Sequence, residues 1–102
     1  MMMMEIYKNE WGDPEDLDGT VIDAEILPDG SIRLAGTDYG KSARDFSGRD
    51  EYEYGLHIPS DHMSQFELEL LRRSFNLRGL LTMSKVERVC KNADIPVETW
   101  RY

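Results

Sequence analysis

The first half of the chain alternates apolar and polar residues in short runs, a pattern typical of β-strands with one buried face. Residues 20–27 and 31–35 both alternate in this way, and they flank the sequence Pro28-Asp29-Gly30. This is a turn sequence, because Pro fixes φ, Asp bonds nearby backbone and Gly takes a left-handed conformation. The pattern predicts a β-hairpin whose core positions are Ile22, Ala24, Ile26, Ile32 and Leu34.

Residues 51–58 alternate just as clearly, and they predict another strand of an antiparallel sheet with one buried face. Two shorter strands are predicted at 5–8 and at 97–102. In the strand over 51–58, one face carries Tyr52, Tyr54, Leu56 and Ile58, and the other carries Glu51, Glu53, Gly55 and His57.

The second half of the chain changes to helical spacing. A helix is predicted over residues 60–76, with Ser60 as its N-cap. A second helix is predicted to begin near Thr82 or Ser84, where Ser84 and Glu87 match a capping box.

The stretches 10–19 and 36–40 are predicted to be irregular, because their glycines and prolines interrupt regular structure. A short helical turn is predicted over 41–46. The order of elements predicts an α+β fold, a largely antiparallel sheet of about four to five strands with two helices packed on one face. A chain of 102 residues fits one domain, residues 1–102, and we expect the native start at Met4, after Met1–Met3.

The charge is strongly acidic and unevenly distributed. Lys and Arg number 12 against 20 Asp and Glu, so the net charge is −8. Residues 1–69 hold 5 bases and 17 acids (net −12), and residues 70–102 hold 7 bases and 3 acids (net +4). An acidic protein lacks the basic surface that binds nucleic-acid phosphates or anionic lipid heads. We therefore expect no direct nucleic-acid or membrane partner, and a basic protein partner instead.

Candidate catalytic chemistry is sparse. His57 and His62 are the two histidines, and with the single Cys90 they lack the close spacing of a zinc site. Cys90 falls on the apolar stripe of a predicted helix, where a free cysteine is usually a core residue. The stretch around Asp16-Leu17-Asp18 has Pro14 at the first ligand position of a calcium loop, which argues against that motif. We therefore expect no enzymatic activity, no metal and no cofactor, and the single cysteine favours a reducing, cytoplasmic location.

The acidic residues before the hairpin and along strand 51–58 predict a face that steers and binds a basic partner. Trp11 lies within this acidic region and is a candidate anchor, because Trp is favoured at interface hot spots. The predicted partner-binding residues are Trp11, Asp13, Glu15, Asp16, Asp18, Asp23, Glu25, Glu51, Glu53 and His57.

Three blocks of sequence carry a resemblance to other proteins. They are the strand and Gly-x-Asp-x-Gly turn of 29–40, the Tyr-Glu-Tyr strand of 50–59 and the Ile-Pro-x-Glu aromatic tail of 95–102. In this order they resemble a loose group of small, mostly uncharacterised bacterial proteins, of which some look like immunity proteins of toxin systems. The chain departs from the group at Gly55 and Val97, where bulky aromatic residues are expected. The resemblance implies a stoichiometric binder and carries no catalytic residues over.

Three functions follow as hypotheses from these observations. The first is an immunity-type inhibitor that neutralises a cognate bacterial toxin by binding it through an acidic face. The second is a phage-type or nucleic-acid-mimicking inhibitor of a nuclease complex, comparable to anti-CRISPR proteins. The third is a small enzyme with an unrecognised site, which a deep pocket holding His57 or His62 beside carboxylates would favour.

Overall fold

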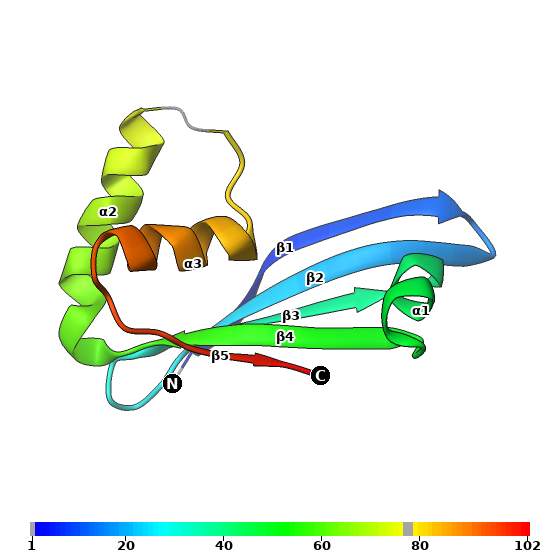
Figure 1. Ribbon diagram of the computed structural model, residues 1–102, viewed down its shortest axis with the longest axis horizontal. Helices are drawn as coiled ribbons and strands as arrows, with labels where there is room; N and C mark the ends of the chain where they lie inside the picture. The colour runs from blue at the N-terminus through cyan, green and yellow to red at the C-terminus, as the bar shows by residue number, and fades with distance from the viewer. Residues whose placement is uncertain (1, 77–78) are drawn as a thin grey trace.

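The computed structural model describes residues 2–76 and 79–102 and shows an α+β fold, as the sequence predicts (Figure 1). Five antiparallel strands follow one another across a single sheet in the order β1-β2-β3-β4-β5. The strands are β1 (Met2–Asp13), β2 (Asp16–Ile26), β3 (Ile32–Tyr39), β4 (Glu51–Ile58) and β5 (Glu98–Arg101). The helices are α1 (Lys41–Ser47), the short 3-10 helix η1 (Ser60–His62), α2 (Met63–Phe75) and α3 (Met83–Asn92).

The long hairpin of β1 and β2 corrects the prediction that residues 10–19 form an irregular loop. The two strands pair from Met2 opposite Ile26 to Asp13 opposite Asp16, so only Pro14 and Glu15 lie between them. Gly12 takes a positive φ of 97° next to this tight turn, and the Glu15 amide donates to Asp13 Oδ1 over 2.9 Å. The glycine and proline therefore shape the tip of a hairpin instead of ending its strands.

Residues 36–39 were also predicted to turn, and they instead continue β3. Three glycines within the strands lie directly opposite aromatic residues of the next strand, in the pairs Gly19–Tyr39, Gly36–Tyr54 and Gly55–Trp100. A Cβ atom added at any of them would lie 2.0 to 2.3 Å from the aromatic ring. The rings thus occupy the space above the glycines and supply the packing that glycine lacks in a strand.

The hairpin predicted around Pro28-Asp29-Gly30 is confirmed. Gly30 has a φ of 86°, and Asp29 Oδ1 accepts hydrogen bonds from the backbone N–H of Ser31 at 2.9 Å and from its hydroxyl at 2.5 Å. The strands on either side pair from Ile26 opposite Ile32. The turn therefore fixes the register that places the apolar residues of both strands on the same face.

Helices α2 and α3 cover one half of a face of the sheet, and α1 lies at its opposite end (Figure 1). We call this covered side the inner face and the opposite side the outer face. The core joins residues of β3 and β4 to the helices and to the segment before β5. Its buried members are Leu34, Leu56, Ile58, Phe66, Val86, Cys90 and Ile95.

Helix α3 begins next to Thr82, one of the two predicted starts, whereas two predictions of N-terminal capping are wrong. Ser60 makes no side-chain capping bond, because residues 60–62 form the 3-10 turn η1 and α2 begins only at Met63. The N-cap of α3 is Thr82, whose hydroxyl accepts from the Lys85 amide over 3.2 Å. Ser84 is therefore inside the helix and does not form the predicted capping box. Within the described residues, no helix is both long and apolar enough to cross a membrane.

Candidate functional site

The predicted partner-binding residues do not share one face, because 10–25 is a hairpin and its side chains alternate between the two sides of the sheet. Trp11 and Asp18 lie opposite each other and face inward, and Asp13, Glu15 and Asp16 are at the hairpin tip. The outer face receives the other five, which are Asp23, Glu25, Glu51, Glu53 and His57.

Two of the predicted residues hold α1 in place. Asp16 forms an ion pair with Arg44, and Asp18 Oδ1 accepts a hydrogen bond of 2.7 Å from the Ser42 amide in the first turn of the helix. The hydrogen bond from Arg44 lowers the pKa of Asp16 below its ordinary value of 3.8. These carboxylates are therefore engaged in the fold of the chain itself.

The outer face gathers acidic side chains from four strands without a helix of the described chain above it. Alternation and register place seven Asp or Glu residues on it, against the two bases Lys8 and Arg33, which gives a net charge of −5 with His57 neutral. Sequence reasoning identified four of the seven acids. The set is Glu5, Glu10, Asp23, Glu25, Glu51, Glu53 and Glu98, and the three that were missed are Glu5, Glu10 and Glu98.

An aromatic residue lies flat within this acidic surface. Trp100 covers Gly55, and the Arg33 guanidinium carbon lies 4.5 Å from the centre of the Trp100 ring. A cation at this distance over an indole is held by the ring's negative face. The contact with Trp100 holds the Arg33 side chain in one position on the outer face, on the side of the sheet formed by β3, β4 and β5.

The residues considered for catalysis lie apart from one another. His57 is on the outer face between Arg33 and Glu98, and His62 is in η1, with its Nδ1 atom 3.4 Å from Gln65 Oε1. Cys90 is fully buried, and burial raises the pKa of its thiol to about 11. Within the described chain, no group of three or more His, Cys, Asp or Glu side chains is placed to hold a metal ion.

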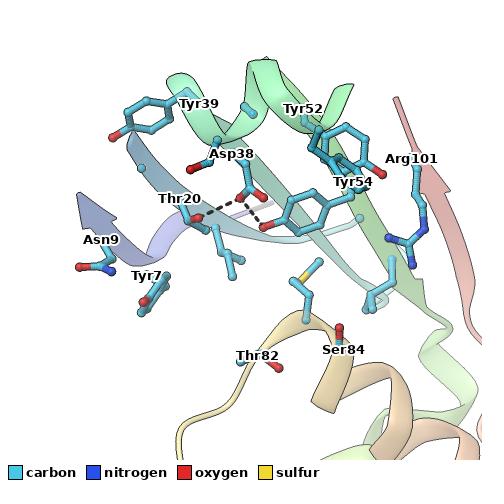
Figure 2. Close-up of a pocket in the computed structure, with 18 of the residues that line it drawn as sticks. Tyr7, Asn9, Thr20, Asp38, Tyr39, Tyr52, Tyr54, Thr82, Ser84 and Arg101 are labelled. Atoms are coloured by element: carbon cyan, nitrogen blue, oxygen red, sulfur yellow. Dashed lines mark hydrogen bonds between the residues drawn. The ribbon is translucent and has the colours of Figure 1, made fainter. Parts of the chain in front are cut away.

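A groove that sequence reasoning missed crosses the inner face, between α1 and the N-terminal end of α3. It has a volume of about 580 Å³. Figure 2 shows Asp38 at its floor, with Thr20 and Tyr54 pointing toward the same carboxylate oxygen. Asp38 Oδ1 accepts from Thr20 Oγ1 at 2.8 Å and from Tyr54 Oη at 2.9 Å. Desolvation and the Asp38 carboxylate both raise the pKa of Tyr54, so its phenol remains a proton donor.

The walls of the groove are mainly aromatic and apolar. Phe46 of α1 packs edge-on against Tyr52, with ring centres 5.1 Å apart, and Tyr52 in turn lies beside Tyr54. Several rim residues are large and exposed, among them Trp11 (45%) and Tyr7 (43%). Asn9 of β1 and Arg101 of β5 also line the groove.

Comparison with family models, with curated proteins and with solved structures returned no match.

Proposed function

We propose that this protein is an immunity-type inhibitor, a non-enzymatic binder that neutralises a basic bacterial toxin through its outer face. The observation that carries the proposal is the concentration of seven carboxylates from four strands on this face. Carboxylates held on adjacent strands form a rigid negative surface, because the sheet fixes their spacing before a partner arrives.

The charge distribution between the layers supports a directed encounter. The outer face has a net charge of −5, whereas α2 and α3 together carry five bases and three acids, a net of +2. Such a separation orients the protein as it approaches a basic partner. Electrostatic steering of this kind raises association rates by about 10- to 1,000-fold at low ionic strength.

The test is co-expression with the product of the neighbouring gene, with growth and complex formation as readouts. We expect the wild-type protein to restore growth and to form a complex whose association rate falls as salt increases. Absence of both rescue and complex would overturn the proposal. DNA or RNA that displaces the inhibitor from its partner would instead support nucleic-acid mimicry.

A matched pair of charge variants locates the binding surface. The outer-face variant D23N/E25Q/E51Q/E53Q removes four negative charges from this face, and it should lose rescue. The control variant D13N/E15Q/D45N/E67Q removes the same charge from the hairpin tip and from helices, and it should retain rescue. Equal loss in both variants would show that net charge alone matters, and the outer face would then not be the site.

A further inference from the structure

We propose that the groove on the inner face binds an organic cation, an ammonium or guanidinium group seated between Asp38 and the aromatic side chains of β1. This site is on the opposite side of the sheet from the outer face. It therefore does not rest on the proposed function, and either can fail without the other.

The carboxylate of Asp38 lacks a cationic partner in the described chain. Its Oδ1 atom accepts from two neutral hydroxyls, those of Thr20 and Tyr54, and no described residue donates to Oδ2. A carboxylate on a partly buried sheet face is costly unless it is paired. The two hydroxyls orient the group and leave its second oxygen without a donor among the described residues, so a positively charged donor in the groove would complete its coordination.

The surroundings of Asp38 select an organic cation over a metal ion. Asn9 is opposite Thr20 on the neighbouring strand, so this position offers one carboxylate and one amide beside the two hydroxyls that donate to Asp38. A divalent metal requires more oxygen ligands than these supply. Tyr7 and Trp11 stand on the same face of β1, two residues to either side of Asn9. Their rings offer the negative π faces that bind ammonium and guanidinium groups.

Arg101 is the cationic side chain of the described groove lining, and its position does not block this site. Arg101 is on β5, where it pairs with Tyr54 of β4. Strand β5 is two strands away from β3, which carries Asp38, and this corresponds to about 10 Å between strand axes. Figure 2 shows the Tyr54 ring between Asp38 and Arg101, with Tyr7 and Asn9 on the other side of the carboxylate. The proposed cation therefore binds on the β1 side of Asp38.

The two tryptophans of the chain give an internal control for the test. Both residues contribute to the groove lining, but Trp11 is on the inner face of β1, whereas the Trp100 ring packs over Gly55 and against Arg33 on the outer face. The probe is n-butylammonium chloride, titrated into the ¹⁵N-labelled protein while both indole N–H resonances are followed by NMR. We expect saturable shifts of the Trp11 resonance, with little change at Trp100. Butan-1-ol and KCl at matched concentration should leave Trp11 unchanged, and equal shifts with either of them would overturn the proposal.

Asp38→Asn is the main variant, since the amide oxygen can still accept from Thr20 and Tyr54. It should weaken butylammonium binding by at least about tenfold, the cost of losing a charged hydrogen bond. The control Glu53→Gln removes the same charge from the outer face and should change binding by less than about twofold. Similar weakening in both variants would overturn the site.

Tyr7→Leu tests the aromatic wall without touching the carboxylate, and it keeps the test informative if Asp38→Asn does not fold. Tyr7 is 43% exposed on an edge strand, so we expect the fold to be retained. The variant should bind butylammonium more weakly, and unchanged affinity would contradict the role of the Tyr7 ring in the proposed site. Titration with spermidine and with a lysine-containing peptide then distinguishes a free amine from a side chain presented by a protein. Failure of both to shift Trp11 would overturn the proposal.

Discussion

The contact between Gly36 and Tyr54 predicts that Gly36→Ala lowers the free energy of unfolding when Tyr54 is present and raises it when Tyr54 is replaced by alanine. A Cβ atom at Gly36 would lie 2.3 Å from Tyr54 Cε2 and 2.5 Å from Cζ, and the three nearest contacts are all to the Tyr54 side chain. Gly36 does not have a positive φ, so alanine fits its backbone. Gly36→Ala must therefore displace the Tyr54 ring, and with it the hydroxyl that bonds Asp38.

The magnitude follows from two opposing effects. Overpacking of this kind costs about 1–3 kcal/mol. The alanine also restricts the unfolded chain, which offsets about 0.5–1 kcal/mol of that cost. We expect Gly36→Ala to reduce the free energy of unfolding by about 1–2 kcal/mol in the wild-type background. In a Tyr54→Ala background the same change should stabilise by about 0.5–1 kcal/mol, so the coupling energy is about 1.5–3 kcal/mol.

The assay is urea denaturation followed by far-UV circular dichroism on the four proteins of the double-mutant cycle. Gly19→Ala in the Tyr54→Ala background is the matched control, because its added Cβ would meet Tyr39 and not Tyr54. That control should remain destabilising. Equal costs of Gly36→Ala with and without Tyr54 would refute the argument that the ring occupies the space above this glycine.

Three further predictions concern the helices and the core. Thr82→Ala should lower the free energy of unfolding by about 0.5–2 kcal/mol because it removes the N-cap of α3, and Ser84→Ala should cost less than about 0.5 kcal/mol, both measured by urea denaturation. The Asp16–Arg44 pair lowers the pKa of Asp16 below 3.8. The pair therefore stabilises the folded protein at pH values above the pKa of Asp16 in the unfolded chain, and this stabilisation is lost as the pH falls through the pKa in the folded protein. In Arg44→Met, an NMR titration should show that pKa returning toward 3.8. Cys90, with a pKa of about 11, should resist iodoacetamide at pH 8 until the protein unfolds; rapid alkylation of the folded protein would contradict its burial.

The sequence predicted the parts of the fold that depend on local patterns. The alternation in 51–58 and the turn at Pro28-Asp29-Gly30 are complete within a few residues, and both are confirmed. The continuation of β3 through Gly36 was missed, because the residue that compensates for this glycine is Tyr54 on the next strand. A non-local contact of this kind has no signature in a single stretch of sequence.

The groove was missed for the same reason. Asp38 was assigned to a turn, and its partners Thr20 and Tyr54 come from two different neighbouring strands. The pairing of these strands depends on the sheet order and register, which the sequence did not determine. The outer acids were partly predictable, since alternation within 51–58 places Glu51 and Glu53 on one side.

The β1–β2 hairpin shows why an acidic stretch of sequence is not one acidic surface. Side chains on the inner side meet helices and neighbouring strands, so Asp18 is hydrogen-bonded to α1. Those on the outer side, such as Asp23 and Glu25, face away from the helices of the described chain. Truncating an inner carboxylate removes contacts that the folded chain itself uses, whereas truncating an outer one removes charge available to a partner. The two sets of variants should therefore separate in their effects. Asp18→Ala should loosen the docking of α1 and lower the free energy of unfolding, because it removes the acceptor of the Ser42 amide. Asp23→Ala should leave that free energy nearly unchanged and slow association with a basic partner.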